Sequence, residues 1–162
     1  MTAKNSKNTS IKVLCVCLGN ICRSPAAQGV LEFDARRRAL MMQVDSAGTA
    51  AYHLGKSPDP RSIAALSKHQ IDISGQQARQ VQLTDFDEYD WVLAMDKSNL
   101  NNLMKICPSN LQSKLVLFSQ FSGGDEDVKD PYYGADEGFD KMFEHLKSLS
   151  EFFLDHIESQ RL

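Results

Sequence analysis

A buried strand is expected to give way to a helix at Cys17-Leu18-Gly19-Asn20-Ile21-Cys22-Arg23-Ser24-Pro25. Residues 11–16, just before it, are apolar except for one lysine, as in a strand buried on both faces of a parallel sheet. Ser24 suits the N-cap of a helix, and Pro25 suits its first position. The stretch therefore predicts a short loop with a thiol at one end and a guanidinium at the other.

The predicted loop has the features of a phosphate-binding site. Backbone N–H groups at a helix N-terminus point toward a bound anion, and the helix dipole favours its negative charge. Arg23 adds a fork of donors that can contact two phosphate oxygens. The residues predicted to bind the phosphate group are Leu18, Gly19, Asn20, Ile21, Cys22, Arg23 and Ser24.

Cys17 is the predicted nucleophile. A thiol at a helix N-terminus beside an arginine ionises more easily than a free cysteine, so we expect a thiolate at neutral pH. A thiolate beneath a phosphate monoester can attack phosphorus, while Arg23 and the loop amides stabilise charge on the equatorial oxygens. Phosphoryl transfer requires little beyond this arrangement. The hydroxyl of Ser24 could also donate to the sulfur of Cys17 and make it a better leaving group.

Further motifs accompany this loop along the chain. They are Asp45-Ser46-Ala47-Gly48-Thr49, Ser57-Pro58-Asp59-Pro60-Arg61-Ser62, Ala78-Arg79-Gln80 and Asp130-Pro131-Tyr132-Tyr133-Gly134. With them, nearly the whole chain from Ile11 onward resembles the low-molecular-weight protein tyrosine phosphatases. The resemblance implies hydrolysis of phosphotyrosine through a phosphocysteine intermediate, phosphotyrosine-containing proteins as partners, and inhibition by phosphate and vanadate.

Asp130 is the candidate general acid, because a tyrosine leaving group needs a proton as the P–O bond breaks. Pro131 favours extended geometry at Asp130, and the resemblance assigns the acid role to this aspartate. The alternative is that Asp-Pro simply begins a turn. In the second step the same carboxylate would activate water against the phosphocysteine.

Tyrosines are predicted to line the mouth of the pocket. Tyr132 and Tyr133 could form an aromatic wall against which a phosphotyrosine ring stacks. In the family this pair flanks the cleft and can itself be phosphorylated, which implies a tyrosine kinase as a further partner. Tyr52 stands where many members carry an aromatic residue, and we expect a role in recognition. Its neighbour His53 is predicted to lie on the surface.

Asn20 and Ser46 are predicted to support the loop. A loop whose N–H groups turn inward is strained, and side-chain hydrogen bonds can hold it. In the family these residues form a network with a histidine. Gln76 stands at the expected place of that histidine, so this support contains a group that forms hydrogen bonds but does not titrate.

Apolar strands alternate with helical patterns along the chain. Strands are predicted at residues 11–16, 41–44, 90–95 and 115–118, and helices at residues 25–40, after Pro60, after Asp96 and from Phe139 onward. This alternation predicts a single α/β domain with a doubly wound parallel sheet and helices on both faces. The resemblance adds that the sheet has four strands. The ligand is expected at the carboxyl ends of the strands, where Cys17 falls.

The composition fits an intracellular enzyme. We expect residues 1–10 to be a disordered polar tail and residues 11–162 to be one domain. The tail has no apolar core, so neither a secretory signal nor a membrane anchor is predicted. Four cysteines without such a signal favour reduced thiols and a cytoplasmic location. The net charge of −3 argues against nucleic-acid binding.

No cofactor or metal is predicted. The cysteines lack the paired Cys-x-x-Cys spacing of structural zinc sites. The loop around Gly19 matches neither a Walker sequence nor a dinucleotide-binding turn. Cys15 and Cys107 are expected to be ordinary buried residues.

Two other functions remain open, and Cys22 has two interpretations. Arsenate reductases use a similar loop but relay electrons through further cysteines, and no cysteine pair occurs between Ile71 and Met95. The other alternative is a non-catalytic phosphate-binding module. Cys22 is predicted to trap oxidised Cys17 as a disulfide before irreversible oxidation, unless it serves only in packing.

Overall fold

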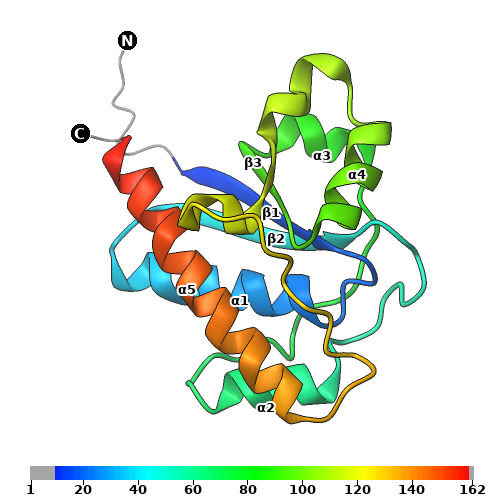
Figure 1. Ribbon diagram of the computed structural model, residues 1–162, viewed down its shortest axis with the longest axis vertical. Coiled ribbons are helices and arrows are strands. Elements are labelled where there is room, and N and C mark those ends of the chain that lie inside the picture. The colour runs from blue at the N-terminus through cyan, green and yellow to red at the C-terminus, as the bar shows by residue number, and fades with distance from the viewer. Residues whose placement is uncertain (1–9, 161–162) are drawn as a thin grey trace.

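Four parallel strands in the order β2-β1-β3-β4 form the centre of the computed structural model, which describes residues 10–160. The strands are β1 (Ile11–Cys17), β2 (Met42–Gly48), β3 (Trp91–Ala94) and β4 (Leu115–Leu117). The helices are α1 (Arg23–Arg37), α2 (Pro60–Ser67), α3 (Leu83–Glu88), α4 (Lys97–Ile106) and α5 (Glu137–Ser159), with short 3₁₀ helices η2 (Ser109–Lys114) and η3 (Phe118–Ser122). Helices cover both faces of the sheet, which confirms the predicted doubly wound α/β fold (Figure 1).

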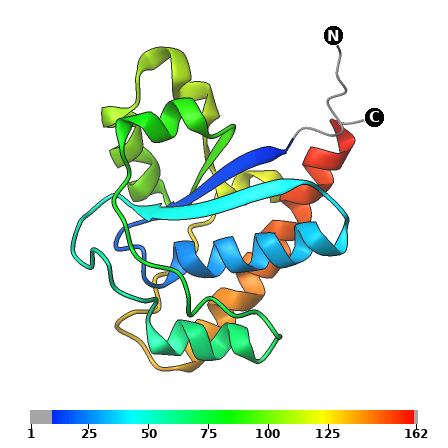
Figure 2. The ribbon, with the colours of Figure 1, turned by 180° about the vertical axis from the view of Figure 1, so that it is seen from behind.

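The central strand β1 contributes to both hydrophobic cores. Val13 and Cys15 belong to the core that contains residues of α1, α2 and α5. Leu14 and Val16 belong to the core on the other face, with residues of α3 and α4. Seen from behind, the sheet separates the same two groups of helices (Figure 2). Because β1 pairs with both β2 and β3, Cys17 at its carboxyl end lies at the switch point of the sheet.

Several element bounds differ from the predicted ones. Strand β2 continues to Gly48, because its last residues stay in register with β1 up to the pairing of Gly48 with Cys17. Helix α1 ends at Arg37 rather than near Leu40, since Ala39 adopts a left-handed φ of 57°. Helix α3 is not predicted by the sequence, because its 6 residues are too few to display a helical period.

The described part of the chain begins just before β1 and ends just after α5. The predicted polar tail falls outside the described residues except for Ser10, which precedes β1. Helix α5 carries the expected apolar stripe, which is buried against α1 and α2. Within residues 10–160, no helix has the length and apolar character needed to cross a membrane.

Candidate active site

The phosphate loop, residues 17–23, joins the end of β1 to the start of α1. Its two end residues, Cys17 and Arg23, are buried, with exposed fractions of 2% and 3%. The loop forms one side of a pocket of about 110 Å³. The pocket is lined by Cys17, Leu18, Gly19, Ile21, Cys22, Arg23, Tyr52, His53, Asp130, Tyr132 and Tyr133. The structure thus brings the three predicted catalytic residues and the three predicted recognition tyrosines to one pocket, while Asn20, Ser24 and Ser46 are buried outside its lining.

The sulfur of Cys17 is surrounded by hydrogen-bonding groups. The backbone N–H of Asn20 donates to Sγ across 3.3 Å, and Oγ of Ser24 lies 3.1 Å from Sγ. The prediction that Ser24 caps α1 is wrong, because the helix begins two residues earlier than predicted, with Cys22 at the N-cap and no side-chain cap. Pro25 accordingly occupies the third helical position instead of the first. The Ser24 hydroxyl is engaged by the loop and not by the helix end.

Arg23 is held in place from behind. Its Nη1 donates to Oδ2 of Asp96 across 2.5 Å and to the carbonyl of Val128 across 3.0 Å. Burial lowers the pKa of the guanidinium, but the nearby Cys17, Asp96 and Asp130 raise that pKa above its ordinary value. Arg23 is therefore a fixed cation at the edge of the pocket.

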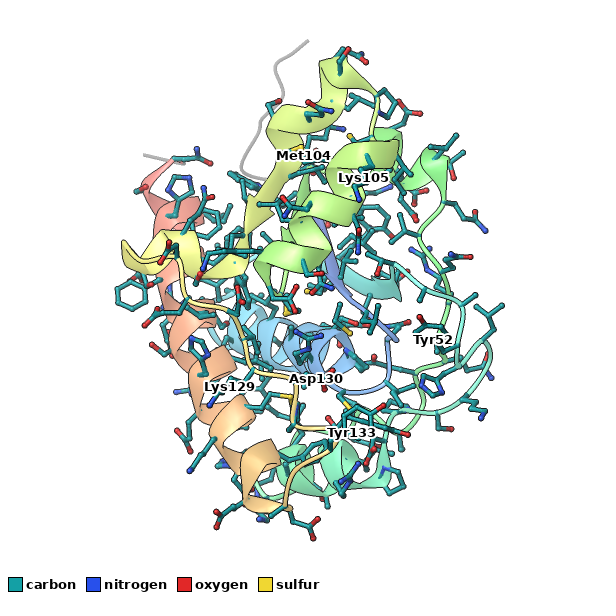
Figure 3. The ribbon with its side chains drawn as sticks, turned by 45° about the vertical axis from the view of Figure 1, so that its right-hand side comes forward. Tyr52, Met104, Lys105, Lys129, Asp130 and Tyr133 are labelled. Carbon is teal, nitrogen blue, oxygen red and sulfur yellow. The ribbon has the colours of Figure 1, made fainter. Side chains whose placement is uncertain are left out.

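Asp130 reaches the pocket from the acid loop, which we define as residues 123–136. Oδ2 lies 3.6 Å from Nη2 of Arg23, and Oδ1 accepts a hydrogen bond from the N–H of Tyr132 across 3.1 Å. The second contact is the turn expected of Asp-Pro, while the first places the carboxylate beside Arg23 at the pocket. The side chain of Asp130 is 41% exposed, which leaves it open to a ligand (Figure 3).

Asn20 is the centre of a hydrogen-bond network beneath the loop. It adopts a left-handed φ of 59° and is 2% exposed. Its Nδ2 donates to Oγ of Ser24 across 2.8 Å and to Oγ of Ser46 across 3.0 Å, and its Oδ1 accepts from the N–H of Arg79 across 2.9 Å. Gln76 extends the network, since its Oε1 lies 3.5 Å from Oγ of Ser46 and its Nε2 donates to the carbonyl of Pro25 across 3.1 Å.

The end of β2 braces the phosphate loop from the side. The N–H groups of Thr49 and Ala50 donate to the carbonyls of Cys17 and Leu18 across 2.9 Å and 3.0 Å. A Cβ atom at Gly48 would lie 2.7 Å from the carbonyl oxygen of Leu18, closer than such atoms approach. Glycine at this position therefore allows the loop and β2 to come together.

Aromatic residues surround the opening of the pocket. Tyr52 is 70% exposed and Tyr133 94% exposed, and they come from different loops (Figure 3). The prediction that His53 lies on the surface needs correction. His53 is half-buried, its ring centre is 6.3 Å from that of Tyr132, and a Cβ atom at Gly19 would lie 3.0 Å from its Cδ2. No feature of the neighbouring sequence indicates that His53 is half-buried at the pocket, because the residues around it are typical of an exposed loop.

Asp96 is a site residue that the sequence identifies only as a helix cap. Its Oδ1 accepts from the N–H of Asn99 across 2.7 Å, which is the expected cap of α4. Its Oδ2 binds Arg23, a contact between positions 73 residues apart that no local pattern reveals. In residues 10–160, no three or more His, Cys, Asp or Glu side chains gather in a way that could hold a metal ion.

Known phosphatases are similar to this chain in sequence and in structure. Residues 12–162 match the family model described as low molecular weight phosphotyrosine protein phosphatase. A protein of that name from Schizosaccharomyces pombe is 39% identical over 91% of this chain and 97% of its own. A crystal structure of a protein tyrosine phosphatase from Entamoeba histolytica, with Hepes in its active site, has a TM-score of 0.89 and 33% identity over 94% of this chain and 99% of its own. The chain belongs to the low molecular weight phosphotyrosine protein phosphatase family.

Proposed function

We propose that this protein hydrolyses phosphotyrosine in proteins through a phosphocysteine intermediate. The observation that carries the proposal is the meeting of Cys17, Arg23 and Asp130 at one small pocket. A thiolate, a fixed cation and a carboxyl group are the nucleophile, the electrostatic stabiliser and the proton donor that this reaction needs. The sequence relationship to phosphotyrosine protein phosphatases supports the same reaction.

In the proposed first step, Sγ of Cys17 attacks phosphorus as the bond to the tyrosine oxygen breaks. The proton of the Asp130 carboxyl group passes to the departing phenolate, and Arg23 stabilises charge on the phosphoryl oxygens. In the second step, Asp130 takes a proton from water as the water oxygen attacks phosphorus. The S–P bond breaks, Oγ of Ser24 stabilises the departing sulfur, and inorganic phosphate is released.

Phosphotyrosine suits the opening of the pocket better than phosphoserine. Tyr52, Tyr132 and Tyr133 offer aromatic surfaces to a substrate ring at the mouth, while the phosphate reaches the buried sulfur. Inorganic phosphate and vanadate should compete for the same loop. We therefore expect metal-independent hydrolysis of phosphotyrosine peptides and of p-nitrophenyl phosphate, with competitive inhibition by both anions.

An Asp130→Asn variant tests the role of the acid. Loss of the proton donor should lower kcat/KM by about 10²–10⁴-fold for phenyl phosphate, whose leaving group needs a proton, and by much less for p-nitrophenyl phosphate. Steady-state kinetics with a series of substituted phenyl phosphates gives the comparison. The control is Asp125→Asn on the same loop, whose side chain is 85% exposed. An equal loss for every leaving group would mean that another residue donates the proton.

We also propose that Cys22 protects oxidised Cys17. Peroxide would convert the Cys17 thiolate to a sulfenic acid, and Cys22 would displace water to form a disulfide. Both cysteines line the pocket. Burial, followed by the charges of Asp59 and Asp130, raises the pKa of Cys22 well above its ordinary value, so this thiol is protonated near neutral pH. Because the attacking form is the thiolate, the disulfide should form faster as pH rises.

Cys22→Ser separates protection from packing. After peroxide and then dithiothreitol, we expect the wild type to recover activity and the variant to recover little, although its activity before oxidation is substantial. Recovery of the wild type should increase with the pH of the peroxide step. Peptide mapping should find a Cys17–Cys22 linkage. Equal recovery in both proteins, or a map without the linkage, would leave Cys22 a packing residue.

We further propose a cytoplasmic location and a tyrosine kinase as a partner. The four cysteines are free thiols, in keeping with a reducing compartment. Tyr133 is the better kinase target of the two loop tyrosines, because it is 94% exposed whereas Tyr132 is half-buried against Arg61 and His53. Cell fractionation and phosphopeptide mapping test the two statements.

A further inference from the structure

Arg61, near the start of α2, holds the part of the acid loop that follows Asp130. Its Nη2 donates to the carbonyl of Tyr132 across 3.0 Å, and its Nη1 to the carbonyl of Gly134 across 3.5 Å. The central carbon of its guanidinium also lies 4.5 Å from the ring centre of Phe139 and 5.6 Å from that of Tyr132. The side chain therefore contacts this segment through hydrogen bonds and through aromatic rings.

Asp59 fixes the direction of the Arg61 side chain. Its Oδ1 accepts from the backbone N–H and from Nε of Arg61 across 2.9 Å and 3.0 Å, and its Oδ2 accepts from Nη2 across 2.9 Å. These hydrogen bonds lower the pKa of Asp59, which keeps its carboxylate charged at neutral pH. A guanidinium held by two carboxylate oxygens has little freedom to turn away from the acid loop.

The same turn of α2 is bonded to the phosphate loop. The N–H of Asp59 donates to the carbonyl of Ile21 across 2.8 Å, and Oγ of Ser62 donates to the carbonyl of Cys22 across 3.1 Å. Residues 59–62 are thus hydrogen-bonded to both loops of the site. They set the position of one loop relative to the other.

Asp130 lies between two attachment points of the acid loop. Before it, the N–H of Val128 donates to the carbonyl of Met95 across 2.8 Å, and Arg23 donates to the carbonyl of Val128. After it, Arg61 donates to the carbonyls of Tyr132 and Gly134, and the N–H groups of Gly138 and Phe139 in α5 donate to the carbonyls of Ala135 and Asp136. Without Arg61, residues 132–134, which lie next to Asp130, would lose their hydrogen bonds to α2, and the loop after Asp130 would be held only at the start of α5.

We propose that Arg61 is a positioning residue for the general acid, an inference that rests on the proposed role of Asp130. A proton donor must be held within about 0.5 Å of its productive place, and a shift of about 1 Å can lower a rate by about 10²-fold. Arg61 supplies this placement through the backbone on the carboxyl side of Asp130. It does so without contributing to the binding of the phosphate group.

An Arg61→Met variant tests the placement. It keeps an unbranched apolar stem against Phe139 and Tyr132 but donates no hydrogen bond. We expect kcat/KM for phenyl phosphate to fall by about 10–100-fold, that for p-nitrophenyl phosphate to fall by only about 2–3-fold, and the inhibition constant of inorganic phosphate to stay within about 2-fold. In an Asp130→Asn background, Arg61→Met should cause almost no further loss, because the group that it positions is gone.

Lys68→Met is the matched control. Lys68 is also a cation at α2, and its Nζ binds the Asp140 carboxylate at 2.9 Å and 3.1 Å, but it makes no hydrogen bond to the acid loop in the described structure. Its replacement should leave kcat/KM unchanged for both phenyl phosphate and p-nitrophenyl phosphate. Because Arg61→Met leaves the buried Asp59 unpaired, the Asp59→Asn/Arg61→Met double variant is measured as well; asparagine keeps the N-cap of α2.

The outcomes are distinct. An equal loss for both substrates in the two Arg61 variants, a weaker binding of phosphate, or an undiminished effect in the Asp130→Asn background would overturn the positioning role. A failure of the proposed function is seen elsewhere, in an Asp130→Asn protein whose rates do not depend on the leaving group. The proposal is supported if at least one folded Arg61 variant loses more kcat/KM for phenyl phosphate than for p-nitrophenyl phosphate. This difference must also vanish when the Arg61 change is made in the Asp130→Asn background.

Discussion

A Cys17→Ser protein is expected to lose turnover by on the order of 10⁴–10⁶-fold while still binding inorganic phosphate. A serine hydroxyl at this place is protonated, and no general base among the described contacts of Cys17 could activate it, since its neighbours are an amide N–H and the Ser24 hydroxyl. The anion site persists because Arg23 and the loop backbone are untouched. Turnover of p-nitrophenyl phosphate and calorimetric titration with phosphate measure the two properties.

Cys107→Ser is the control for the loss of a thiol. Cys107 ends α4, and its Sγ donates to the carbonyl of Pro108 across 3.5 Å, in the core on the other face of the sheet. Its replacement should leave turnover near that of the wild type. Retained turnover in Cys17→Ser would remove Cys17 as the nucleophile, and loss of phosphate binding together with turnover would point to a collapsed loop.

Arg23→Lys is expected to lower kcat/KM by about 10³–10⁵-fold, the range found when an arginine is removed from a phosphoryl-transfer site. Arg23 already uses Nη1 to bind Asp96 and the Val128 carbonyl, which leaves the rest of the fork for phosphate. An ammonium group is a single point of charge and cannot serve both sides with the same geometry. A lysine would be drawn toward Asp96 and away from the substrate.

The affinity for phosphate distinguishes Arg23→Lys from Cys17→Ser. Arg23→Lys should weaken the binding of phosphate as well as slow the reaction, whereas Cys17→Ser affects turnover alone. Arg36→Lys, an exposed change at the other end of α1, is the control and should be silent. Near-normal phosphate affinity in Arg23→Lys would show that charge suffices and that the planar fork is not required.

The sequence predicts those parts of the fold and site that depend on neighbours along the chain. The strand before Cys17 and the buried stripe of α5 are predicted by the spacing of apolar residues. The position of Cys17 at the switch point is predicted by the alternation of strands and helices along the chain. Ser24 shows the limit of such reasoning. Its type is ideal for a helix cap, but its hydroxyl contacts Asn20 and Cys17 and α1 has no side-chain cap, so tertiary contacts decide its role.

Residues that act across the fold were beyond prediction for the same reason. Asp96 is 73 positions from Arg23, and Arg61 is 71 positions from Tyr132. Each lies at the start of a helix, where an aspartate or an arginine has an ordinary explanation in local structure. Only the packing of α2 and α4 beside the phosphate loop brings these side chains to the site.

The network under the phosphate loop has a consequence for how the enzyme responds to acidity. Asn20, Ser24, Ser46 and Gln76 hold the loop through amide and hydroxyl groups, none of which gains or loses a proton in the physiological range. A phosphate monoester changes from monoanion to dianion near pH 6. These supporting groups therefore keep the same arrangement and the same charge while the charge of the substrate changes. The pH dependence of the reaction is set by the substrate and by the groups that exchange protons with it.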